Sequence, residues 1–73
     1  MLEQEIVSQI EMLKKQGFTE EQIAYHWATL VRDDKITPDE FAGLMICLGA
    51  MPPKGFDAMT ESQKKAYITK GLN

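Results

Sequence analysis

Residue types that build metal and redox sites are nearly missing from this chain. Its 73 residues include one cysteine, one histidine and one tryptophan. A single cysteine, Cys47, can neither form a disulfide within the chain nor supply a thiolate cluster for zinc. Because Cys47 stands in an apolar run, we expect a small buried hydrophobic side chain and not a reactive thiol. The composition predicts no metal site and no cofactor.

A catalytic set of side chains is also missing. His26 has no thiol and no second histidine as a companion, and Ser8 and Ser62 have no base near them in the sequence. The acidic pairs fall at predicted helix starts and turns, where capping and the helix dipole account for them. We therefore expect a protein that is not an enzyme and has no catalytic residues.

Strong charge and long apolar runs are absent as well. The formal net charge is −3 at pH 7, which is the wrong sign for broad binding of phosphates. No apolar stretch approaches the roughly 20 residues of a membrane-spanning helix. Residues 1–5 carry no basic stretch ahead of an apolar one, as a secretory signal would. We expect no membrane association and a cytoplasmic location.

Three capping boxes are the clearest feature that the sequence does contain. In each, a threonine precedes a predicted helix and a glutamine or glutamate follows three residues later. The threonine hydroxyl accepts a backbone N–H of the first turn, and the longer side chain accepts the N–H of the threonine. The three pairs are Thr19–Gln22, Thr37–Glu40 and Thr60–Gln63.

Apolar residues recur at helical spacing around these boxes, which predicts an all-α fold. The predicted helices span approximately residues 2–16, 20–32, 38–48 and 61–70. They form a compact mini-domain of about four short helices, with residues 1–73 as one domain. Trp27 lies on the apolar stripe of the second helix and is predicted to be in the core. In the last helix we expect Ala66, Tyr67 and Ile68 to face inward, and a left-handed ending at Gly71.

The third predicted helix is apolar nearly all round, and two interpretations of it stay open. It is either the central helix of the bundle, or its exposed side forms an interface. Gly43 lies within it at a cost of about 1 kcal/mol relative to alanine, which predicts a close approach by a neighbouring helix. The following residues 50–58 hold two prolines, which favour extended structure. Met51 and Phe56 either fix this segment to the core or form an exposed apolar patch.

Residues 33–41 resemble the exit half of an EF-hand calcium loop. If Glu40 took the twelfth loop position, Val31 would take the third and Asp34 the sixth, where that family has glycine. Val31 has no side-chain oxygen, and calcium needs at least six converging oxygens. We therefore interpret the segment as a connector between helices.

The third helix lacks the Arg, Lys, Asn or Gln side chains that read DNA base edges. Direct reading of DNA by this helix is therefore not expected.

Residues 30–44, with the segment Ile-Thr-Pro-Asp-Glu-Phe at 36–41, are similar to helical segments of small bacteriophage and prophage accessory proteins. The resemblance implies an accessory protein of a bacterium or phage, in the host cytoplasm if phage-encoded. Surplus apolar side chains without a catalytic set predict a protein-binding module. Together with the resemblance, this favours a small phage or mobile-element regulator or inhibitor that docks on a host or phage protein. The candidate contact residues are Tyr25, His26, Ile46, Met51 and Phe56.

Lysines near the end of the chain support an alternative function. They are either ordinary solvated side chains or a basic patch for an acidic partner or a nucleic-acid backbone. The alternative is therefore a nucleic-acid-binding regulator. A homodimer through the third helix is compatible with the first hypothesis. The possible patch consists of Lys54, Lys64, Lys65 and Lys70.

Overall fold

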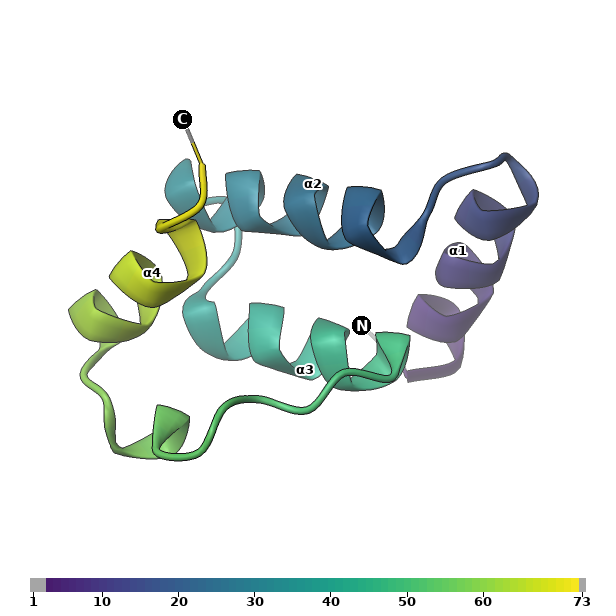
Figure 1. Cartoon of the computed structure of the whole chain (residues 1–73). Helices are drawn as coiled ribbons and strands as arrows, with labels where there is room; N and C mark the ends of the chain where they lie inside the picture. Colours follow the sequence, from purple (N-terminus) through teal and green to yellow (C-terminus); the bar gives the residue numbers. More distant parts are fainter. Residues whose placement is uncertain (1–2, 73) are drawn as a thin grey trace.

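A computed structural model describes residues 3–72 of the chain, and these residues form helices without strands (Figure 1). The all-α prediction is confirmed. The elements in order are α1 (Glu3–Lys15), α2 (Glu20–Arg32), α3 (Pro38–Leu48), the single 3₁₀ turn η1 (Phe56–Ala58) and α4 (Glu61–Thr69). The predicted bounds of α2 and α3 agree with the structure, whereas α4 ends one residue earlier than expected. Leu2, the predicted start of α1, lies outside the described residues.

All three predicted capping boxes are present. At the start of α3, the Glu40 N–H donates to Thr37 Oγ1 at 3.1 Å, and the Thr37 N–H donates to Glu40 Oε1 at 2.9 Å. Thr19 and Thr60 begin α2 and α4 in the same way. These hydrogen bonds join residues only three positions apart, so each helix start is defined locally.

Left-handed residues follow α2 and α3, whereas the predicted left-handed ending of α4 is missing. Gly49 follows α3 in the left-handed conformation, with φ of 102°. Asp34 adopts the same conformation after α2, with φ of 58°, which aspartate tolerates better than most residues. The left-handed ending predicted at Gly71 is wrong, because the Leu72 N–H donates to the Thr69 carbonyl at 3.0 Å in a tight turn and Gly71 has no positive φ.

Helices α2 and α3 run side by side in opposite directions, with α1 at one end of the pair and α4 at the other (Figure 1). α3 contacts the other three helices, as expected for a central helix. Its outer side nevertheless stays exposed at Ile46. The interpretation as a central helix is therefore supported, and an interface on the exposed side stays a prediction.

The core cluster takes its residues from the first three helices. Trp27 is buried there, which confirms its prediction as a core residue. The cluster consists of Ile10, Ile23, Trp27 and Leu48, with Phe41, Met45 and other partly buried residues packed around it. In α4 the prediction was wrong for Ala66 and Tyr67, which are exposed, whereas Ile68 is partly buried. The buried residue of that helix is Lys64.

Gly43 does not mark a close approach between helices. A Cβ atom added at this position would meet nothing within 4 Å. The predicted contact is therefore wrong, and the glycine only weakens α3.

Replacing Gly43 with alanine should raise the free energy of unfolding by about 1 kcal/mol, because alanine restricts the unfolded chain and clashes with nothing in α3. Urea unfolding followed by circular dichroism measures the change. Gly49→Ala is the matched comparison and should lower the free energy by about 1–2 kcal/mol, since its φ is left-handed. Equal effects of the two substitutions would contradict this account.

Removing a capping hydroxyl should destabilise the fold. Thr37→Ala is expected to lower the free energy of unfolding by about 1 kcal/mol, because the Glu40 N–H loses its acceptor. Thr37→Ser keeps the hydroxyl and should stay within a few tenths of the wild type in the same urea experiment. A large loss in the serine variant would show that the methyl group, and not the cap, matters here.

Candidate functional site

The five predicted contact residues lie in three separate surface hollows. Met51 and Phe56 line a first hollow between α3, residues 50–56 and α4. Tyr25 and His26 line a second hollow beside Phe18, where α1 meets α2. Ile46 lines a third hollow between α1 and α3. The structure therefore does not bring the predicted residues together into one surface.

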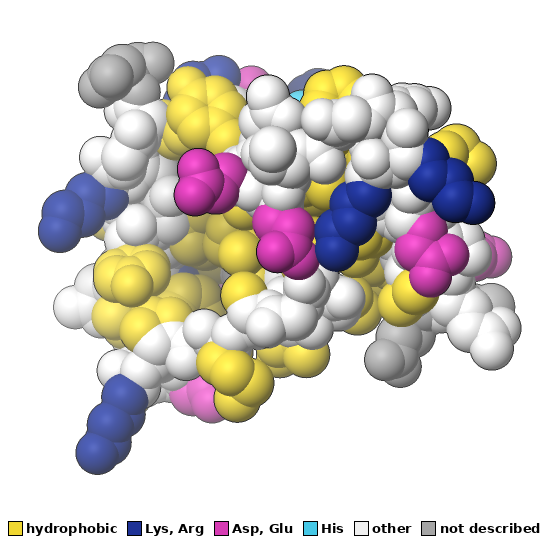
Figure 2. Space-filling model, turned by 45° about the vertical axis from the view of Figure 1, so that its right-hand side comes forward, with side chains coloured by type: hydrophobic (Ala, Val, Ile, Leu, Met, Phe, Trp, Pro, Cys, Tyr) yellow, Lys and Arg dark blue, Asp and Glu magenta, His cyan; other side chains and the backbone are white. Residues whose placement is uncertain are grey.

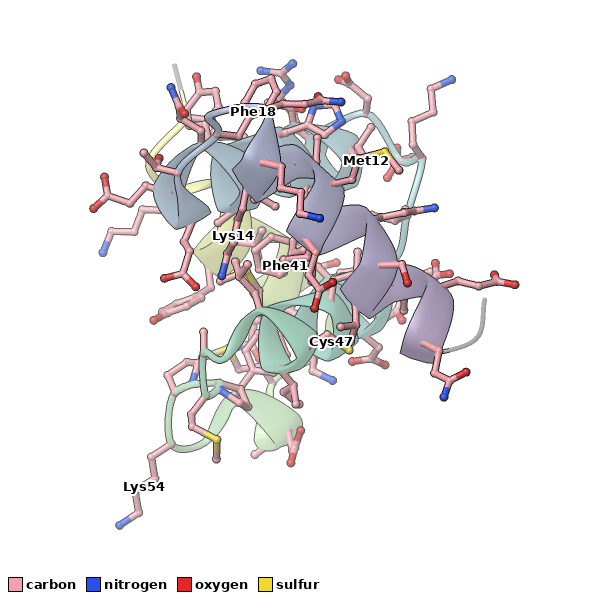
Figure 3. The ribbon with its side chains drawn as sticks, turned by 90° about the vertical axis from the view of Figure 1, so that its right-hand side faces the viewer. Met12, Lys14, Phe18, Phe41, Cys47 and Lys54 are labelled. Atoms are coloured by element: carbon pink, nitrogen blue, oxygen red, sulfur yellow. The ribbon has the colours of Figure 1, made fainter. Side chains whose placement is uncertain are left out.

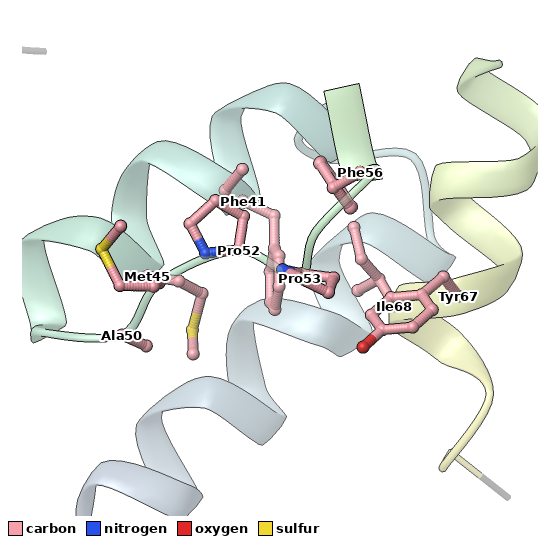
Figure 4. Close-up of a pocket in the computed structure, with 10 residues that line it drawn as sticks. Phe41, Met45, Ala50, Pro52, Pro53, Phe56, Tyr67 and Ile68 are labelled. Atoms are coloured by element: carbon pink, nitrogen blue, oxygen red, sulfur yellow. The ribbon is translucent and has the colours of Figure 1, made fainter. Parts of the chain in front are cut away.

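The first hollow is built from three stretches of chain that are distant in sequence. It has a volume of about 250 Å³ and an almost entirely apolar lining (Figure 4). α3 contributes one wall, residues 50–53 a second and α4 a third. The lining residues are Phe41, Ala42, Met45, Ala50, Met51, Pro52, Pro53, Phe56, Tyr67 and Ile68.

Another hollow, at the start of α2, adjoins this one. The two hollows share Met45 and Ala50 as lining residues. The hollow at the start of α2 extends past Leu48 to Glu20 and Glu21. We call the joined surface the apolar groove. Figure 2 shows hydrophobic side chains lining a recessed region, with acidic side chains at its rim.

Met51 and Phe56 have opposite positions in the apolar groove. Phe56 is only 4% exposed and forms its floor, whereas Met51 is 85% exposed at its rim. Phe56 is thus corrected from a surface contact to a structural residue. Its ring meets Tyr67 edge to face, with centroids 6.3 Å apart, a favourable geometry for two aromatic rings. Phe56 fixes residues 50–58 to the fold, whereas the Met51 side chain stays exposed to solvent.

The predicted basic patch is divided by ion pairs within the fold. Lys64 Nζ lies 2.8 Å from Asp39 Oδ1, and Lys65 Nζ lies 2.8 Å from Asp34 Oδ1. Among residues 3–72, Lys54 and Lys70 make no ion pair. Lys54 extends away from the fold (Figure 3). The four lysines therefore do not act as one exposed surface.

Lys64 has a structural role that sequence reasoning missed. Its ammonium group lies 5.3 Å from the centre of the Phe56 ring, within the range of a cation–π interaction. The hydrogen bond to Asp39 raises the pKa of Lys64 above its usual value, since it favours the charged amine. Lys64 thereby ties α4 to α3 and to the floor of the apolar groove.

The second and third hollows contain the other three predicted contact residues, Tyr25, His26 and Ile46. Tyr25 is 55% exposed beside the exposed His26 in the second hollow, and Phe18 forms part of the same wall. Ile46 is also 55% exposed, next to Cys47 in the third hollow. Cys47 is partly buried against the core, as its apolar surroundings predicted. Each hollow is a separate apolar surface and neither continues into the apolar groove.

The described part of the chain contains neither a cluster of metal-binding side chains nor a membrane-spanning helix. Over residues 3–72, no group of three or more His, Cys, Asp or Glu side chains could hold a metal ion. In the same residues, no helix has the length and apolar character needed to cross a membrane.

Comparison with known proteins adds no relative. No protein-family model, curated protein or solved structure matches the chain. The candidate site therefore rests on the geometry of this molecule alone.

The pH dependence of stability tests the role of Lys64. A raised pKa in the folded state stabilises the fold below pH 10.5, the ordinary lysine value, and this contribution is lost as pH rises through the folded pKa. The wild type should therefore lose stability relative to Lys64→Met as pH rises above 10.5. Urea midpoints of both proteins, measured from neutral to alkaline pH, check this.

Lys70→Met is the control for that experiment, because Lys70 has no ion pair among the described residues. Its difference from the wild type should stay constant over the same pH range. If the Lys64→Met difference is also constant, the ion pair with Asp39 does not stabilise the fold.

Proposed function

We propose that this chain is a non-enzymatic protein-binding module that uses the apolar groove as its contact surface. The observation that carries the proposal is Met51, an apolar side chain that is 85% exposed beside an apolar hollow. Exposed apolar surface next to a hollow is typical of a site that another molecule covers. Methionine is suited to such a surface because its flexible side chain adapts to different partners.

The shape of the apolar groove favours a protein segment over a small molecule. Small-molecule pockets usually enclose about 300–1,000 Å³ and cover most of the ligand. Each of the two hollows is smaller than that by itself, with about 250 Å³ for the first and about 230 Å³ for the adjoining one that reaches Glu21. An elongated, shallow and apolar surface of this kind fits a helix or an extended segment of a partner.

In its fuller form, the proposal is a small phage or mobile-element regulator or inhibitor that acts by covering part of a host or phage protein. The similarity of residues 30–44 to phage accessory proteins supports this origin. Nucleic-acid binding through the lysines has less support, because Lys64 and Lys65 are engaged with Asp39 and Asp34.

Affinity capture with matched methionine variants tests the proposal. We expect the wild-type chain to retain a specific protein from a bacterial lysate, and Met51→Asp to lower its recovery about tenfold. The reason is that a buried methionine contributes about 1.5–3 kcal/mol and each 1.4 kcal/mol is tenfold in affinity. Quantitative mass spectrometry of the retained proteins gives the recoveries.

Met12→Asp is the control, since Met12 is 60% exposed on α1 and does not line the apolar groove. It should retain the same protein as the wild type. Urea midpoints of both variants show whether the fold persists. Equal recoveries by folded Met51→Asp and Met12→Asp would contradict the groove as the contact surface.

A further inference from the structure

The apolar groove has a negative end without a basic side chain to balance it. Among the described residues, Glu20 and Glu21 are the only charged residues in the lining of its two hollows. Glu20 is paired with Lys14 at 3.2 Å, whereas Glu21 makes no ion pair in residues 3–72. The positive end of the α2 dipole offsets only about half a charge, so the fold does not fully balance the Glu21 carboxylate.

The end of α3 adds negative potential at the same place. Residues 48–50, which close that helix, line the same hollow as Glu21. The carbonyl end of a helix carries about half a negative charge, which lysine or arginine in the last turn commonly offsets. α1 and α2 each have a basic residue in the last turn, but α3 has none. A cation at this position would therefore meet both a carboxylate and a helix C-terminus.

We propose that the occupant of the apolar groove is a protein segment with a lysine or arginine beside a run of apolar side chains. Its apolar side chains would cover Met51 and the lining of the first hollow. Its cation would lie at the other end, between Glu21 and the last turn of α3. The inference rests on the proposed function, because it names the chemistry of the partner that the same surface binds.

The apolar contacts and the charge have different roles in this complex. Burial of Met51 and the groove lining supplies most of the affinity, since removal of apolar surface from water is the main driving force of association. An exposed ion pair adds little affinity, but it fixes the direction of the bound segment and penalises wrong partners. An acidic segment or a nucleic-acid backbone would bring like charge to Glu21 and is disfavoured.

The other two hollows do not predict the charge of an occupant in this way. The second hollow, with Tyr25 and His26, has no lysine, arginine or carboxylate in its lining. The third hollow has Glu40 as its only charged lining residue, and that carboxylate already accepts the N–H of Thr37 in the capping box. Charge complementarity therefore points to a basic partner only at the apolar groove.

Selection from a phage-displayed library of random peptides tests the proposal without a known partner. We expect the peptides that bind the wild type but not Met51→Asp to contain a lysine or arginine next to apolar residues. Synthetic copies, measured by fluorescence anisotropy, should bind Glu21→Lys about fivefold more weakly than the wild type, because the reversal turns an attractive exposed pair into a repulsive one. Copies with glutamine in place of the basic residue should bind both proteins equally.

Two further variants make the test specific. Glu11→Lys has the same change in net charge on α1, outside the apolar groove, and should bind the peptides like the wild type. Glu21→Gln removes the charge without reversing it and should bind about twofold more weakly. It serves in place of Glu21→Lys if urea midpoints show that the reversal weakens the fold.

The outcomes separate the inference from the proposed function. Peptides that depend on Met51 but lack a basic residue, or that bind the folded Glu21 variants as tightly as the wild type, overturn the inference and leave the proposed function standing. A chain that forms dimers in sedimentation equilibrium, and loses them with Met51→Asp, also overturns it, because a second copy then occupies the groove. If no selected peptide depends on Met51, the inference fails, and the lysate capture with Met51→Asp decides the proposed function separately.

Discussion

The ammonium group of Lys64 links the last helix to α3 and to Phe56, and the apolar groove depends on that helix. α4 has 9 residues, too few to persist without docking, and none of its described residues belongs to the core cluster. Lys64 instead bonds to the Asp39 carboxylate and lies over the Phe56 ring. These contacts position Tyr67 and Ile68 as one wall of the groove. A structural lysine thus helps to position one wall of the apolar groove.

Local contacts define the starts of α2, α3 and α4. Each capping box closes within one helical turn, and the left-handed Gly49 ends α3 at once. Such local signals define the helices, so a small core around Ile23 and Trp27 has only to orient them. A chain near this length buries only roughly 60% of the surface that its unfolded form exposes. Apolar side chains such as Met51 therefore remain outside the core and available for binding.

By itself the sequence determined the all-α class, the three capping boxes, the bounds of α2 and α3, and Trp27 as a core residue, because hydrogen bonds over three residues and apolar periodicity are local properties. The tertiary structure alone decided that Phe56 is buried, that Lys64 is structural and that Met51 and Ile46 face different hollows. Those features depend on how helices far apart in the chain meet. Periodicity shows which side of a helix is apolar, but it does not show which distant carboxylate or ring a lysine will reach.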